Sequence, residues 1–266
     1  MNDYESSVKN TAISVLGQIA LPEALLSIDR LIKSTFDEEV EAKAKAIWAI
    51  GMIAEGCDDG VILPIIDHLS SKIWKVKAAC LFTISAFGER VSKYATNILT
   101  GMMKNNNINK QAVAETLIKI GAEGERYLIK TIVSMPNSDY KMKSDIVRSF
   151  ASTNVNSPNI DFIVECLYSA AQNGYSVVRK SSLLSLQTLY NNSKGNITYL
   201  KDCNIIPFFQ TAMKDKDPEI QYLSVQFFKS LGPQGDIIFI DGLTQDPSPI
   251  IRCQSAIGLG KFNIKN

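Results

Sequence analysis

The segment AKAKAIWAIGMI, residues 42–53, decides the fold of this chain. It opens with an apolar–basic dipeptide, places the small residue Ala46 four positions after its start, and adds Ile47, Ile50 and Ile53 at offsets 5, 8 and 11. At about 100° per residue, offsets 0, 4, 8 and 11 fall within one narrow arc of a helical wheel. The segment is therefore predicted to be an amphipathic helix with one packed face.

The same pattern recurs along the whole chain. Its copies start at residues 8, 42, 76, 109, 142, 178, 220 and 251, so the spacings are 34, 34, 33, 33, 36, 42 and 31 residues. Between successive copies lies a second apolar helix, predicted for example at 22–35, 60–70, 123–135, 160–172 and 235–244. Helix pairs at this period are typical of an α-solenoid, in which each pair packs on its neighbours. We call the intervening helix of each pair the A helix and the helix that carries the pattern the B helix.

The pattern resembles the HEAT repeat, whose B helix opens with an apolar–basic dipeptide. The clearest copy is the last, DPSPIIR at 246–252, followed by Ser255 and by Leu259-Gly260. The first copy, LGQI at 16–19 followed by PEA at 22–24, is similar to the HEAT-like repeats of phycocyanobilin lyases, and residues 195–231 look closer to an armadillo repeat with a short extra helix near Tyr199. The resemblance implies an all-α, right-handed α-α superhelix (a HEAT/armadillo-like solenoid) of about seven helix pairs, forming one domain over residues 1–266.

The recurring basic residue is expected to have a structural role. Five or six residues before it stands a short polar residue: Asp3, Asp37, Ser71, Asn105, Asn137, Asn173, Asp215 and Asp246. The polar residue can cap the B helix, and the Lys or Arg can satisfy carbonyls or the carboxylate in the adjacent turn. In HEAT repeats neighbouring pairs of this kind form a ladder. Gln221 replaces the basic residue in the copy that starts at 220, so we expect the ladder to be interrupted there.

A candidate binding surface follows from the other face of the B helices. Offsets 2, 6 and 10 point away from the packed arc, and in a HEAT solenoid the B helices line the concave surface. Most copies place polar or charged residues at these offsets, but the copies at 42 and 76 place Trp48, Met52 and Phe82 there. Clustered exposed apolar side chains mark interaction sites, and Trp is a frequent hot-spot residue. We expect these three residues to anchor an apolar segment of a partner, with Arg148 and Lys180 as a polar rim. The alternative is that Trp48 and Phe82 are buried against each other or against the adjacent helix.

Composition and motifs restrict the other function classes. The chain is 45% apolar and 21% charged with a net charge of +1, which is typical of a folded protein and argues against a dedicated nucleic-acid binder. No Walker A motif, dinucleotide glycine fingerprint or Cys-x-x-Cys pair occurs, and the one histidine, His68, is expected to be a solvent-exposed helical residue. We therefore expect no enzyme activity, no catalytic residue, no metal and no cofactor.

The expected role is a non-catalytic scaffold or adaptor that binds protein partners within a larger intracellular assembly. Five scattered cysteines and the lack of a signal peptide or a membrane-spanning stretch favour the cytoplasm, with nuclear, cytoskeletal or ciliary association left open. The sequence opens and closes in a B helix, so its ends are expected either to meet a partner or to continue in a longer array. The alternatives are a HEAT-like bilin lyase or related small-molecule enzyme, and a solenoid that binds nucleic acid weakly through its lysine row.

Overall fold

The computed structural model describes residues 6–19, 23–105, 109–193 and 205–260, and these ranges are all helices and connecting turns. The chain divides into two compact units, residues 1–131 and 132–266. The expected short helix near Tyr199 lies outside the described residues. The all-α helical-repeat fold is confirmed, whereas the expectation of a single domain stays a prediction.

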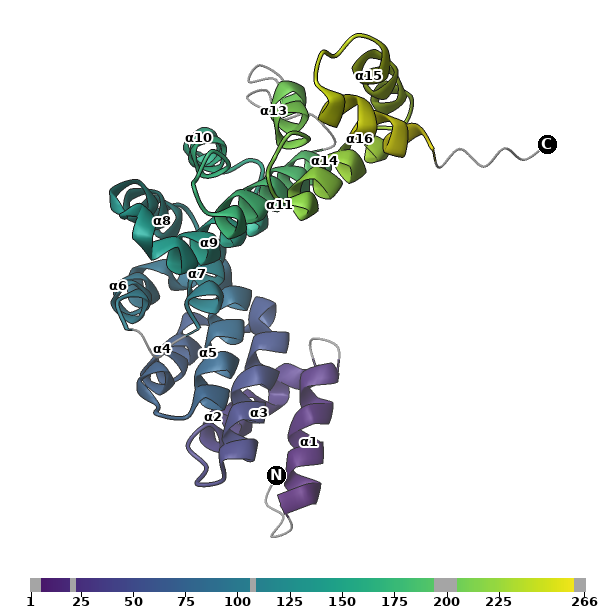
Figure 1. Ribbon diagram of the computed structural model, residues 1–266. Helices are drawn as coiled ribbons and strands as arrows, with labels where there is room; N and C mark the ends of the chain where they lie inside the picture. The colour runs from purple at the N-terminus through teal and green to yellow at the C-terminus, as the bar shows by residue number, and fades with distance from the viewer. Residues whose placement is uncertain (1–5, 20–22, 106–108, 194–204, 261–266) are drawn as a thin grey trace, which may run out of the picture. The chain divides into compact units, whose positions relative to one another are not determined.

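The first unit is built from two layers of helices. Its B helices lie side by side in sequence order, and the A helices pack behind them (Figure 1). The B helices are α1 (Ser6–Gln18), α3 (Val40–Met52), α5 (Trp74–Phe87) and α7 (Lys110–Lys119). The A helices are α2 (Ile28–Ser34), α4 (Ile62–Asp67), α6 (Ser92–Met103) and α8 (Ala122–Ser134), the last of which runs across the boundary at residue 131.

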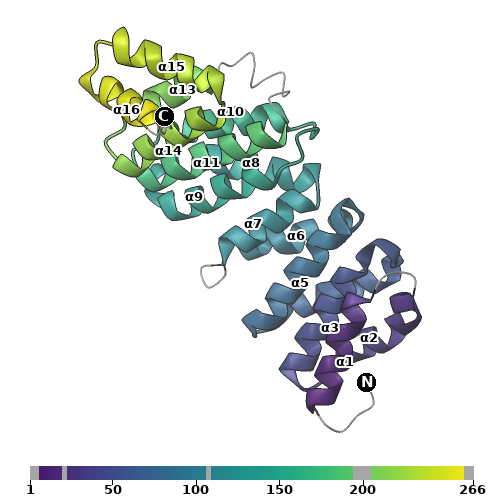
Figure 2. The same ribbon diagram turned by 90° about the vertical axis from the view of Figure 1, so that its right-hand side faces the viewer.

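The second unit repeats this arrangement. Figure 2 shows its B helices side by side, with the A helices along one face. The B helices are α9 (Tyr140–Ser149), α11 (Ser176–Asn192), α14 (Pro218–Ser230) and α16 (Pro249–Leu259), and the A helices are α10 (Ile160–Ala170), α13 (Ile205–Ala212) and α15 (Pro233–Thr244). Each of the eight sequence copies is therefore a B helix, and the A helices fill the intervals as the period predicts.

The residues that the repeat pattern places on the packed face of α3 are buried in the structure. In α3 the residues at offsets 0, 4, 5 and 8, which are Ala42, Ala46, Ile47 and Ile50, are completely buried. The small residues among them let the backbones of adjacent B helices approach closely, and the isoleucines fill the space between the two layers. None of the helices in the described ranges combines the length and the apolarity needed to span a bilayer.

Several A helices are shorter than the sequence predicts. The range predicted at 60–70 contains a six-residue α-helix, α4, between two single 3₁₀ turns, and residues 23–27 of the range predicted at 22–35 also form a 3₁₀ turn. Tighter turns of this kind are common where a helix begins or ends. Pro64 lies in the first turn of α4, where its missing N–H removes no intrahelical hydrogen bond.

Candidate partner-binding surface

Ladder contacts are present in both units. Lys9 pairs with Asp37 in the turn of the following repeat, and Arg179 holds both oxygens of Asp215 through two hydrogen bonds of 2.7 Å. Arg179 also donates to the carbonyl oxygen of Asn173 in its own turn, at 2.9 Å. Lys143 instead stays within its own repeat, where it reaches the side chain of Asn137 at 3.0 Å. The expected structural role of the basic residue is confirmed at these positions.

In five of the repeats the short polar residue folds the turn before the B helix and does not cap the helix itself. These five residues accept a hydrogen bond from the backbone N–H two residues later: Asp37, Ser71, Asn173, Asp215 and Asp246. This is the local pattern of an Asx or Ser turn, which leads the chain into the helix one or two residues further on.

At Gln221 the ladder changes its chemistry. The side-chain amide of Gln221 still donates to the carbonyl oxygen of Asp215, at 2.6 Å, as a basic residue would do in its own turn. Its oxygen, however, accepts a hydrogen bond from Gln254 at 2.8 Å, so Gln221 forms no charged pair with Asp246 in the next turn. The predicted interruption therefore affects the charged contact between repeats and not the contact within the turn.

The outward face of the B helices is narrower than the sequence analysis assumed. Residues at offset 2 were expected to face away from the packed arc, but Asn10, Ala44 and Ser144 are buried. Adjacent B helices stack directly on each other, so offset 2 faces the next B helix. Ser144 hydrogen-bonds Ser181 across such a contact at 2.8 Å. In these copies only offsets 6 and 10 remain available for a partner, whereas Tyr222 and Cys253, at offset 2 of the last two copies, are exposed.

The aromatic surface, which we define as Trp48, Met52 and Phe82, occupies these remaining offsets. The rings of Trp48 and Phe82 stack with their centroids 6.0 Å apart and their planes at 21°. Phe82 keeps 40% of its area exposed and Met52 keeps 48%, while Trp48 is partly exposed. The two rings therefore contact each other and still leave an apolar face open to solvent, while the binding of a partner there stays a prediction.

Glycines of the preceding repeats set the position of these rings. A Cβ atom on Gly17 would lie 3.1 Å from Cζ3 of Trp48, and one on Gly51 would lie 2.9 Å from Cε1 of Phe82. Gly17 and Gly51 occupy offset 9 in successive copies, and Trp48 and Phe82 occupy offset 6. Each ring therefore packs against the glycine of the B helix before it.

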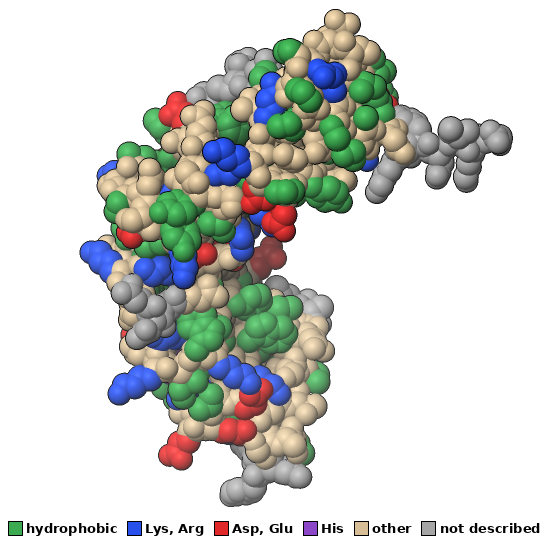
Figure 3. Space-filling model, viewed as in Figure 1, with side chains coloured by type: hydrophobic (Ala, Val, Ile, Leu, Met, Phe, Trp, Pro, Cys, Tyr) green, Lys and Arg blue, Asp and Glu red, His purple; other side chains and the backbone are tan. Residues whose placement is uncertain are grey.

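A charged cluster that the sequence analysis missed lies on the same two helices. Glu41 forms ion pairs with Lys75 and with Lys45, the latter at 3.7 Å. The hydrogen bond from Lys75 is the main reason that the pKa of Glu41 lies below its usual value. Figure 3 shows hydrophobic side chains gathered over α3 and α5 with basic and acidic side chains beside them. The signal was present in the sequence, since residues 41, 45, 48 and 52 share one face of a helix.

The two residues proposed as a polar rim belong to the second unit. Arg148 is exposed on α9, and Lys180 forms an ion pair with Glu219 of α14. Their assignment to the border of the aromatic surface stays a prediction. In the first unit, the charged residues that lie on the same helices as the aromatic surface include Glu41, Lys45 and Lys75.

His68 does not have the solvent-exposed position expected from the sequence. Its ring lies 5.0 Å from that of Phe36, and its Nε2 atom has no hydrogen-bond partner within the described part of the chain. Burial, and then the charge of Lys43, lower the pKa of the imidazole. The structure thus places a half-buried ring where an exposed histidine was expected. The described residues contain no group of three or more side chains suited to hold a metal ion.

The comparisons with known proteins identify no family. No family model matches the sequence, and no curated protein matches it. Among solved structures, the chain is similar to the crystal structure of an engineered protein from the Northeast Structural Genomics Consortium, with a TM-score of 0.44 and 16% identity over 97% of this chain and 75% of that chain. A similarity this low assigns no function.

Proposed function

We propose that this protein is a non-catalytic scaffold or adaptor that binds a protein partner through the aromatic surface on α3 and α5. The observation that carries the proposal is the open apolar face of the stacked rings, with Phe82 40% and Met52 48% exposed side by side on neighbouring repeats. Aromatic and methionine side chains gathered in this way supply most of the binding energy at protein interfaces, with polar groups around them.

The charged cluster suggests what the partner brings to the surface. Within this cluster, Glu41 forms ion pairs with both Lys45 and Lys75. The border of the aromatic surface therefore carries charges of both signs and not of one sign only. A partner that covers the aromatic surface therefore needs an apolar anchor more than a strong net charge. An amphipathic segment with one or two large apolar side chains fits this chemistry.

The ion pairs and hydrogen bonds of the ladder residues favour a protein partner over a nucleic-acid partner. Nucleic-acid binding by the lysine row would require free basic side chains that reach phosphates. Lys9 and Arg179 instead hold carboxylates, and Lys143, which is buried, holds the side chain of Asn137. His68 packs against Phe36, which supports a structural role for the one histidine and favours a non-catalytic protein.

We further propose that the chain is a HEAT-repeat protein of the cytoplasm. The HEAT assignment rests on the eight copies of the repeat pattern and on a ladder of the HEAT type at Lys9–Asp37 and Arg179–Asp215, and the location rests on the five scattered cysteines. The likeness of the first copy to phycocyanobilin-lyase repeats, and that of residues 195–231 to armadillo repeats, belong to the same proposal.

The test is a quantitative pull-down with a matched control. Native extract is passed over the wild-type chain, over a Met52→Ser, Phe82→Ser double variant, and over Trp74→Ser. Trp74 is a suitable control because it is 39% exposed, nearly the same as Phe82, and lies at the first residue of α5.

We expect one stoichiometric partner to be lost from the double variant and retained by the control. Circular dichroism should show the same helix content in all three chains. Identical sets of captured proteins for the wild type and the double variant would contradict the proposal.

A further inference from the structure

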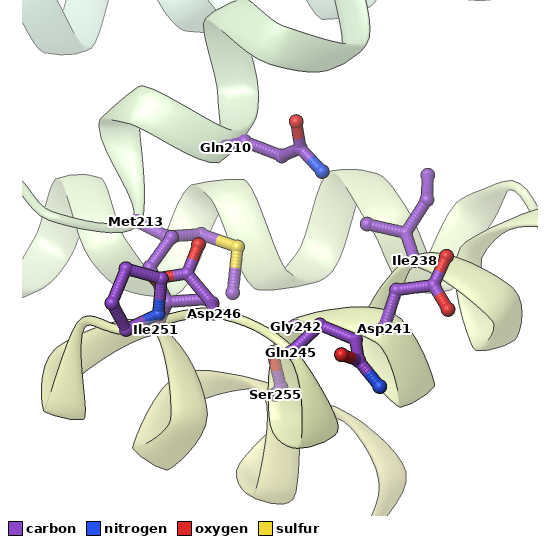
Figure 4. Close-up of a pocket in the computed structure, with 10 residues that line it drawn as sticks. Gln210, Met213, Ile238, Asp241, Gly242, Gln245, Asp246, Ile251 and Ser255 are labelled. Atoms are coloured by element: carbon purple, nitrogen blue, oxygen red, sulfur yellow. The ribbon is translucent and has the colours of Figure 1, made fainter.

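A polar groove lies in the second unit, between α13, α15 and α16. Its volume is about 260 Å³, and its polar lining consists of Gln210, Asp241, Gln245, Asp246 and Ser255. Figure 4 shows Gln210 on one side of the groove and the side chains of Asp241 and Gln245 on the other. We call it the acidic groove, because it contains two carboxylates and no basic side chain.

Two other grooves among the described residues contain a ladder lysine, whereas a third, beside α10 and α13, is lined by Asp215 without its partner Arg179. The groove beside α4 and α6 is lined by Lys77 together with Asn105, the polar residue of the following turn. The groove beside α8 and α10 is lined by Lys143 together with Asn173, again from the following turn. In the acidic groove the following turn contributes Asp246, but no lysine accompanies it.

The reason is the substitution at Gln221. This residue occupies the ladder position that Lys77 and Lys143 hold in their repeats, and it is held by Asp215 and Gln254 outside the acidic groove. Within the described ranges the carboxylate of Asp246 is paired with Lys214, whose Nζ lies 3.9 Å from Oδ1 and whose side chain is 45% exposed, while Arg252 donates to the backbone carbonyl oxygen of Asp246. The exposed, long contact from Lys214 contributes little.

Some oxygen atoms in the acidic groove therefore lack a hydrogen-bond donor. Oδ1 of Asp246 accepts the backbone N–H of Ser248, but its Oδ2 has no partner among the described residues, whereas Asp215 has both oxygens held by Arg179. Ser255 is only 1% exposed, lines the groove, and has an Oγ without a hydrogen-bond partner in the described ranges. A buried hydroxyl left unsatisfied in this way costs about 1–3 kcal/mol.

We propose that the acidic groove binds a primary alkylammonium group, such as the end of a lysine side chain. An ammonium carries three N–H donors and no acceptor, which complements Asp241, Asp246 and the unpartnered hydroxyl of Ser255. Met213, Ile238 and Ile251 line the same groove and offer apolar contacts to the alkyl chain. The bound group takes the place of the ladder cation that Gln221 does not supply, and the site does not depend on the aromatic surface.

The experiment compares n-butylammonium with n-butanol, which has the same alkyl chain and no charge. Both are titrated at low salt into the isotopically labelled full chain, and backbone amide shifts are followed by NMR. We expect the ammonium compound to shift the amides of Asp241, Gln245, Asp246 and Ser255 and to bind at least tenfold more tightly than the alcohol. Equal shifts from the two compounds, or none at these residues, would overturn the proposal.

Three variants test whether butylammonium binds at the acidic groove. Asp241→Asn should weaken butylammonium binding at least fivefold, while Asp236→Asn, on the same helix but outside the lining, should leave it unchanged. Gln221→Arg should abolish binding, because it restores a cation beside Asp246 from within the chain. Wild-type affinity in either Asp241→Asn or Gln221→Arg would also overturn the proposal.

A further comparison identifies the source of the ammonium group. Nα-acetyl-lysine methylamide represents a lysine from a protein partner, and spermidine represents a free polyamine. Tighter binding of the lysine derivative supports a side chain as the occupant, and tighter binding of spermidine supports a small free amine. Failure of both to bind, when butylammonium also fails, would exclude the site altogether.

Discussion

The Arg179–Asp215 pair should be the strongest polar link between two repeats of this chain. Arg179 makes two hydrogen bonds of 2.7 Å to the carboxylate, and only 15% of its side chain and 12% of that of Asp215 are exposed. Hydrogen bonds to charged groups contribute about 1.5–3 kcal/mol when little solvent screens them. Asp215→Asn keeps an oxygen for the N–H of Asp217 and removes the charge, so we expect a loss of about 2 kcal/mol in unfolding free energy.

Arg179→Met should cost more, about 3 kcal/mol, because it also breaks the bond to the carbonyl oxygen of Asn173 and leaves the carboxylate unpaired. The assay is a double-mutant cycle in urea, followed by far-ultraviolet circular dichroism, with a coupling energy of about 1.5 kcal/mol expected. Lys180–Glu219 is the matched control, since it joins the same two repeats but is 36% and 68% exposed. A coupling energy no larger than that of the control pair, for which about 0.5 kcal/mol is expected, would refute the reasoning.

The pH dependence of the same cycle gives a second check. Burial tends to raise the pKa of Asp215, but the hydrogen bonds from Arg179 and from backbone amides outweigh burial and hold this pKa below its usual value. A carboxyl whose pKa is lowered by folding stabilises the protein above its unfolded pKa of about 3.9, and this contribution disappears as the pH falls through the folded pKa. The wild type and Asp215→Asn should therefore differ most near neutral pH and converge in acid.

Three further predictions use other parts of the chain. Gly51→Ala should destabilise the protein by about 1–3 kcal/mol in urea because its Cβ would crowd the ring above it, whereas Gly101→Ala, whose Cβ meets nothing within 4 Å, should stabilise it by about 0.5–1 kcal/mol. The pKa of His68, lowered by burial, should appear below 6.5 in an NMR titration, and stability should fall as the pH drops below that value; a midpoint above it would contradict the half-buried position. Cys253 is exposed and should react with a thiol reagent well before Cys80, whose pKa burial raises to about 12; equal rates would contradict the packing of α5.

The repeat architecture could be predicted because the same side-chain pattern recurs and each copy has to bury the same face. Ala42, Ala46, Ile47 and Ile50 were identified as a packed arc from their spacing, and all four are completely buried. The lengths of the A helices were less predictable. Their ends depend on local turns, such as the 3₁₀ turns on either side of α4, which the period of the repeat does not specify.

For the candidate surface, the sequence predicted which helix face it occupies but not which residues on that face are exposed. A helical wheel separates buried from outward offsets on one helix, but it does not show how closely the next B helix stacks. Ala44 and Ser144 therefore looked exposed on the wheel and are buried in the structure, whereas Phe82 and Met52 remain open. The exposed fraction of such residues depends on contacts between repeats, which single-helix periodicity cannot supply.

The acidic groove shows how an irregular position in a repeat can indicate function more clearly than a regular one. The sequence identified Gln221 as a break in the basic row, but it did not show that the amide would turn to Asp215 and Gln254 and leave the next carboxylate with a long contact to Lys214. Elsewhere in the array Lys9 and Arg179 pair with a carboxylate, and Lys143 donates to the side chain of Asn137. Where the basic residue of the ladder is missing, nearby acceptor atoms lack a donor. Leaving a buried acceptor such as the hydroxyl of Ser255 unpaired costs free energy. The lack of hydrogen-bond donors in the acidic groove therefore favours a ligand that carries such donors. Gln221→Arg should supply a cation from within the chain and so abolish binding of this ligand.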